Sequence, residues 1–101
     1  MNPIWVGKFE VTAPPENEFL EGNAGAFVWA AAQAASAENL VARMEDAMKK
    51  LGLIVVDSEK IEEVIDEDRF SDEVWKLFPE ARRNVESVVC GTWHRFRSFD
   101  A

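Results

Sequence analysis

Cysteine is almost missing from this chain: Cys90 stands alone among 101 residues, so no intramolecular disulfide can form. A single thiol is compatible with a reducing compartment. The segment Met1–Trp5 lacks the basic region and the long apolar region of a signal peptide. No apolar run in the sequence approaches the roughly 20 residues that span a bilayer. We therefore expect a cytoplasmic protein.

Positive charge is scarce as well. The chain has 11 lysines and arginines against 19 aspartates and glutamates, which gives a net charge of −8. Phosphate backbones are bound by clustered Lys and Arg, and anionic membrane surfaces attract basic segments. The charge therefore argues against nucleic acid and membrane partners, and it favours solubility.

The sequence also lacks motifs for catalysis, cofactors and metals. Its acidic segment 57–73 offers oxygen ligands of the kind that calcium and magnesium prefer. However, Asp66 and Asp68 are followed by Phe70 and Ser71, where an EF-hand loop requires a further ligand and a glycine. We expect this segment to be a solvated face or an acidic patch that binds a partner, and we assign no metal or cofactor to it.

Apolar residues, in contrast, are sufficient for one core. They make up 48% of the chain, which includes seven Phe and four Trp. This composition argues against a disordered chain, and the length is that of one domain. The sequence predicts a single α+β domain over residues 1–101.

The stretch 25–56 organises that domain. The runs Phe27–Ala32 and Leu53–Val56 are apolar on both strand faces, as buried strands require. Between them lies a predicted amphipathic helix, with Ser36 as its N-cap and Gly52 just beyond its end. The apolar stripe of this helix contains Leu40, Met44, Ala47, Met48 and Leu51.

The remaining segments complete the order β-β-α-β-α-β. Residues 4–12 alternate as a half-buried strand, and residues 13–24 form a loop whose Phe19-Leu20 pair tucks under the sheet edge. The third strand extends to Ile65 with a bulge near residues 58–60. A second helix starts at Asp72 and a last strand at about Glu86, although residues 80–90 also fit a helix.

This order predicts a two-layer α+β sandwich of ferredoxin-like type. Its four-stranded sheet would carry both helices on one face, because crossover connections between parallel strands are right-handed. The architecture alone implies no activity, since such folds host unrelated functions.

The segment after Trp93 holds a candidate polar ligand site, made of His94, Arg95 and Arg97. Histidine titrates near neutrality and acts as a general base, and arginine clamps carboxylates. The alternative is structural: the arginines pair with carboxylates of the third strand.

The sheet face without helices would carry Phe27, Trp29 and Trp93, which we take as a candidate interaction surface because large exposed apolar patches are rare on monomers. The function expected is therefore a non-catalytic protein–protein interaction module, either a homodimer or an inhibitor-type partner of a basic protein. The alternative is a small enzyme or ligand-binding domain with a pocket near His94 and Arg95 or Arg97. The sequence specifies no ligand, substrate or reaction.

Overall fold

The computed structural model describes residues 2–14, 17–18, 20 and 23–96. Its strands are β1 (Ile4–Thr12), β2 (Gly25–Gln33), β3 (Ile54–Glu63), β4 (Val89–Cys90) and β5 (His94–Phe96). Its helices are α1 (Ala37–Lys49), α2 (Asp72–Trp75) and α3 (Phe78–Arg83), preceded by a 3-10 turn, η1 (Glu67–Arg69). Phe19 and Arg97 lie outside the described residues.

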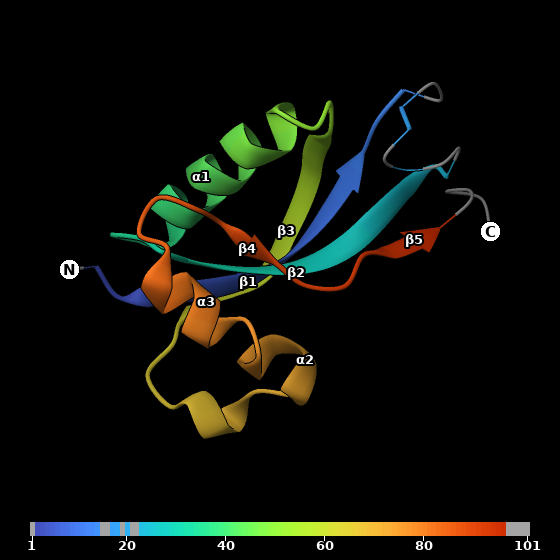
Figure 1. Ribbon diagram of the computed structural model, residues 1–101. Helices are drawn as coiled ribbons and strands as arrows, with labels where there is room; N and C mark the ends of the chain where they lie inside the picture. The colour runs from blue at the N-terminus through green and yellow to red at the C-terminus, as the bar shows by residue number, and fades with distance from the viewer. Residues whose placement is uncertain (1, 15–16, 19, 21–22, 97–101) are drawn as a thin grey trace.

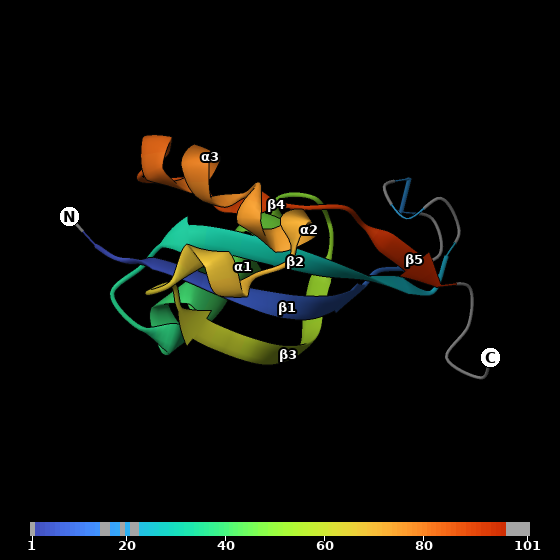
Figure 2. The same ribbon diagram turned by 90° about the horizontal axis from the view of Figure 1, so that it is seen from below.

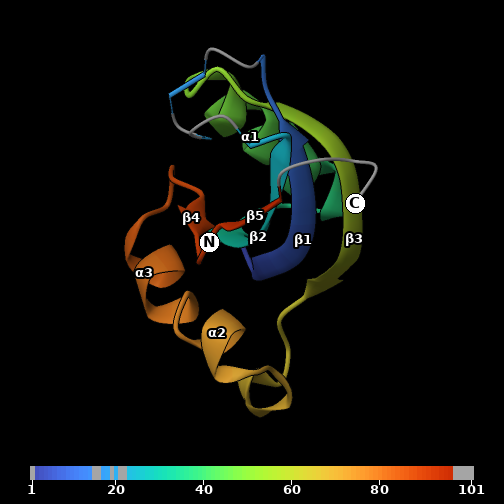
Figure 3. The same ribbon diagram turned by 90° about the vertical axis from the view of Figure 1, so that its right-hand side faces the viewer.

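All strand pairs are antiparallel, and the sheet order is β3-β1-β2-β4. The fifth strand, β5, also pairs with β2: β4 lies against Ala30 and Ala31, and β5 lies against Gly25–Phe27. Strands β4 and β5 therefore share one edge of the sheet, and β3 forms the other (Figure 3). Figure 2 shows β3, β1 and β2 running side by side.

The predicted ferredoxin-like sandwich with a four-stranded sheet is wrong. Among the described residues the sheet has five strands instead of four, in the order β3-β1-β2-β4 with β5 also paired to β2, so β1 lies between β2 and β3. The reason is visible in the residues of β1. Phe9 and Val11 are buried on one face of this strand, and Val6 is buried on the other. A strand that is apolar on both faces takes a central position, whereas the sequence pattern had indicated a half-buried one.

The prediction that both helices cover one face is also wrong. Helix α1 packs through Leu40 and Met44 against Phe9 and Val28, whereas α2 and α3 pack on the opposite face, where Phe78 joins the cluster around Val6. Figure 1 shows α1 above the sheet and α2 and α3 below it. The domain therefore has two small cores with the sheet between them.

Local signals place α1 correctly. The Ser36 hydroxyl accepts a hydrogen bond from the Asn39 amide at 3.1 Å, as an N-cap does, and Gly52 has φ of +75°, which favours glycine. Met44 is fully buried, but Leu51 is 42% exposed, so its predicted packing on the sheet is wrong. Leu51 lies two residues beyond Lys49, the last residue of α1, and the turn at Gly52 takes it away from the apolar stripe.

The other element predictions have mixed outcomes. The bulge expected near residues 58–60 is confirmed, because the β1–β3 register shifts there and Lys60 has φ of +54°. Leu20 is buried in the α1 core, as expected for a residue under the sheet edge. Residues 80–83 belong to α3, and the single last strand is broken into β4 and β5 by residues 91–93.

The contrast between Met44 and Leu51 is testable. Met44→Ala removes a fully buried side chain and should lower the free energy of unfolding by about 2–5 kcal/mol. Leu51→Ala truncates a half-exposed side chain and should lower it by about 0.5 kcal/mol or less. Urea unfolding followed by circular dichroism measures both changes. Equal losses in the two variants would contradict the helix face assigned here.

Candidate functional site

Helices α2 and α3 cover only one end of their sheet face, the end with Val6 and Ala31. At the other end lies a hollow of about 310 Å³ that we call the acidic face. Its lining consists of Lys8, Phe9, Glu10, Phe27, Asp57 and Glu59.

Strand register brings these residues together from three separate segments. Glu10 lies opposite Phe27 across the β1–β2 pair and opposite Asp57 across the β1–β3 pair. Lys8 lies opposite Glu59 in the same way. Because side chains alternate between faces along a strand, the directly opposed residues project to the same side of the sheet.

The acidic face combines an aromatic ring with an excess of carboxylates. The ammonium nitrogen of Lys8 lies 5.3 Å from the centroid of the Phe27 ring and 3.8 Å from a carboxylate oxygen of Glu59. This is the geometry of a cation–π contact beside an ion pair. Glu10 and Asp57 add two further negative charges to the lining. The Phe96 ring lies 5.2 Å from the Phe27 ring, centroid to centroid, and extends the apolar surface toward β5.

The predicted interaction surface is not assembled as expected. Phe27 contributes to the acidic face, and Trp29 packs against the α2–α3 core. Trp93, however, packs against the α1 core on the other side of the sheet. The three aromatic residues therefore do not form one surface: His94 lies opposite Phe27 across the β2–β5 pair, and Trp93, the residue before it, belongs to the other face of the sheet.

The predicted polar ligand site is dispersed as well. The His94 ring nitrogen Nε2 lies 2.6 Å from a carboxylate oxygen of Glu73 in α2, and both side chains are accessible to solvent. Arg95 is the next residue on β5, so alternation places it on the opposite face from His94. Arg97 lies outside the described residues. His94 lines neither the acidic face nor the groove described below.

The alternative prediction for the arginines rested on a strand order that the sheet does not have. It required β5 and β3 to be neighbours, so that Arg95 would pair with the acidic third strand. In the sheet, β1 and β2 lie between them.

A second hollow, of about 490 Å³, lies between α1 and the segment 86–93; we call it the α1–β4 groove. Its apolar lining is Ala47, Met48, Leu51, Val88, Cys90 and Trp93, and its polar lining is Arg43, Asp46, Lys50, Glu86 and Ser87. The sequence pattern did not reveal it. Reading residues 86–99 as one continuous strand had placed Cys90 on the His94 side, whereas Cys90 pairs with Ala30 and joins the α1 core.

Arg43 lines this groove, and hydrogen bonds from Arg43 and Gln33 connect the elements around it. Arg43 donates to the backbone carbonyl of Gln33 and, at 2.8 Å, to that of Val85. The side-chain amide of Gln33 donates to the carbonyls of Ala81 and Arg82, at 3.2 and 3.0 Å, on the other side of the sheet. These contacts tie α1, β2 and the end of α3 to one another.

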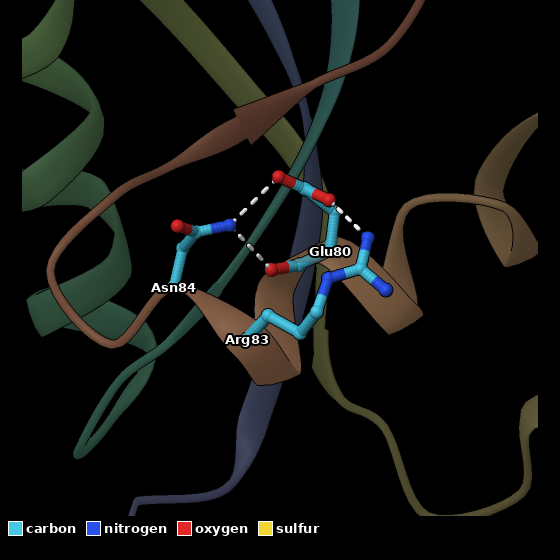
Figure 4. A network of polar contacts seen from close by, with 3 residues as sticks. All are labelled: Glu80, Arg83 and Asn84. Atoms are coloured by element: carbon cyan, nitrogen blue, oxygen red, sulfur yellow. Dashed lines mark hydrogen bonds and ion pairs between the residues drawn. The ribbon is translucent and has the colours of Figure 1, made fainter.

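A polar network also closes the last turn of α3 (Figure 4). The Asn84 amide donates to the carboxylate and the carbonyl of Glu80 at 2.8 and 3.0 Å, and Arg83 donates to the same carboxylate. The hydrogen bond from Arg83, followed by that from Asn84, lowers the pKa of Glu80. The network is exposed to solvent and completes hydrogen bonds at a helix end, so its role is structural.

No cluster of three or more His, Cys, Asp or Glu side chains suited to a metal ion occurs among the described residues. Within that same part of the chain, every helix is too short or too polar to cross a membrane. Comparison of the chain with protein-family models, with curated proteins and with solved structures finds no match.

The partly buried thiol of Cys90 in the α1–β4 groove gives a prediction about reactivity. Burial raises the pKa of Cys90 from 9.0 to about 11, so the thiol stays protonated at neutral pH. Alkylation requires the thiolate. The alkylation rate of the folded protein should therefore keep rising up to about pH 11, whereas that of the urea-unfolded chain should level off near pH 9.0. Coinciding profiles would show that Cys90 is exposed to water.

Proposed function

We propose that this protein is a non-catalytic interaction module that binds a basic protein partner through the acidic face. The observation that carries the proposal is the position of Lys8. Its ammonium group, held over Phe27 and beside Glu59, is the chain's own cation in an aromatic and acidic setting. A lysine or arginine side chain of a partner is the chemical group that this setting accommodates.

The charge distribution supports the same partner. The hollow contains three carboxylates and one ammonium group, so it keeps a net negative charge after Lys8 is counted. The whole chain carries −8 and attracts positively charged proteins over the range that salt screening allows. Complementary charge raises association rates and excludes acidic partners. A cytoplasmic location, predicted from the sequence, is part of this proposal.

The aromatic pair supplies the apolar component of binding. Phe27 and Phe96 are partly exposed side by side, next to the carboxylates of β1 and β3. Interfaces typically surround such aromatic anchors with a polar rim. The acidic face therefore has both components on one surface, and its shape requires no rearrangement of the sheet.

The experiment uses an oligoarginine peptide as the probe and compares two triple variants of equal charge. Glu10→Gln, Asp57→Asn and Glu59→Gln neutralise the acidic face. The control combines Glu18→Gln, Glu38→Gln and Glu45→Gln, which are exposed elsewhere. Each triple changes the net charge by three, from −8 to −5. We expect the first to weaken binding by about tenfold and the second by about threefold or less at low salt.

A single substitution sharpens this test. Lys8→Met removes the internal cation and should strengthen peptide binding, because Phe27 and Glu59 become available to the probe. Lys76→Met changes the net charge equally from an exposed position at the end of α2 that does not line the acidic face, and it serves as the matched control. Fluorescence anisotropy measures all four variants. Equal effects within each matched pair would show only general charge attraction and would refute the acidic face as the binding site.

A further inference from the structure

The two edges of the sheet differ in how they are protected against pairing with another strand. The outer strand β3 carries charged side chains at residues 57, 59, 60, 62 and 63, and its register with β1 shifts twice. Charges and bulges are the usual devices that keep an exposed edge from pairing. Strand β4 has neither device: the segment from Ser87 to Trp93 has no charged residue, and its two strand residues pair regularly with β2.

The unprotected edge also lies beside an apolar hollow. The α1–β4 groove runs along the segment 86–93, and the described part of the chain places no strand on the outer side of β4. Leu51 is 42% exposed at the wall of this groove, and Val88, Cys90 and Trp93 line it only partly buried. A strand added beside β4 would contribute main-chain hydrogen bonds and fill the groove with alternate side chains.

The charges around the groove favour one occupant. Arg43 bonds to Val85, so this part of α1 lies at the Glu86 end. Lys50 lies seven residues further along the chain, about two helical turns away, toward the opposite end. If the same segment of a second copy pairs antiparallel, its Lys50 comes close to Glu86 of the first copy. Its Glu86 comes close to Lys50 of the first copy in the same way. The other two charged lining residues, Arg43 and Asp46, are of opposite sign, and Asp46 lies 3.8 Å from Lys50, so the lining as a whole is neutral and a second copy meets no net repulsion there.

We infer that the α1–β4 groove binds a second copy of this chain. The two β4 strands pair antiparallel about a twofold axis perpendicular to the sheet and join two five-stranded sheets into one. Copies with a net charge of −8 repel each other, so self-association needs a surface whose contacting segments are neutral and whose rim charges balance. The segment 87–93, with Glu86 and Lys50 at its ends, meets both conditions.

This arrangement extends the proposed function without depending on it. In a continuous sheet, equivalent faces of the two copies lie on the same side, so the dimer presents two acidic faces in one direction. A partner with two basic segments then gains effective concentration for the second contact. The dimer is tested with the purified chain alone, without the peptide. A failure to dimerise and a failure to bind the peptide are therefore separate results.

Sedimentation equilibrium of the purified full chain measures the association. We expect a mass of twice 11.4 kDa for the wild-type chain. Val88→Lys places a charge in the groove and should weaken the dimer by about tenfold or more. Val56→Lys, the same change at a 49% exposed position on the opposite edge, should leave the dimer unchanged. Circular dichroism confirms that both variants fold.

Charge reversal tests the antiparallel orientation and uses only exposed residues, which keeps the fold intact. Glu86→Lys and Lys50→Glu should each weaken the dimer by about tenfold, because each places like charges in contact across the twofold axis. The double variant should restore the wild-type dissociation constant. A monomeric wild-type chain would overturn the inference. So would dissociation by Val56→Lys in place of Val88→Lys, or a double variant no tighter than the single ones.

Discussion

The end of β2 is the point from which both helical layers are positioned. Gln33 is buried there, and its side-chain amide donates to two carbonyls in the last turn of α3. Its backbone carbonyl accepts a hydrogen bond from Arg43 of α1, which packs on the other face of the sheet. The side-chain oxygen of Gln33 is buried without a partner among the described residues, a cost of about 1–3 kcal/mol that the hydrogen bonds offset. One residue thereby fixes the ends of two layers on opposite faces of the sheet.

That constraint determines where the sheet remains uncovered. Because α3 ends against Gln33, the short helices cover the part of their face around Val6 and Ala31 and leave the Phe27 end open. Because Arg43 also bonds to Val85, the chain leaves α3 and passes beside α1 before it enters β4. The acidic face and the α1–β4 groove are therefore consequences of the same anchoring residue, on opposite sides of one sheet.

The sequence predicted those features that depend on neighbours along the chain. Helix α1 has its cap at Ser36 and its glycine at position 52 within reach of the helix itself, so composition and spacing are sufficient. Strand order is different, because it depends on which strand pairs with which. The alternation in β1 indicated one buried face, and only the packing of Val6 against α2 and α3 shows that both faces are buried.

The candidate surfaces also depend on strand pairing, and the sequence therefore predicted them only in part. Phe27 was identified from its aromatic character, but the carboxylates beside it were not, because Glu10 and Asp57 meet only through the β1–β3 register, which shifts twice. Cys90 was assigned to the same face as His94 because residues 91–93 interrupt what reads as one strand. A period-2 pattern specifies faces only within an unbroken strand, and an interruption of that pattern changes every assignment beyond it.

The two proposed binding surfaces lie on different strands of one small sheet and differ in charge. The acidic face uses β1, β2 and β3, where carboxylates both attract a basic partner and protect the β3 edge from pairing. The neutral segment 87–93 uses the other edge, where a second copy meets the least repulsion. Since the acidic face and the β4 edge share no lining residue, pairing of two chains leaves each acidic face accessible. In the two proposals, self-association and partner binding are therefore separated by charge: the neutral edge takes the second copy, and the acidic face takes the basic partner.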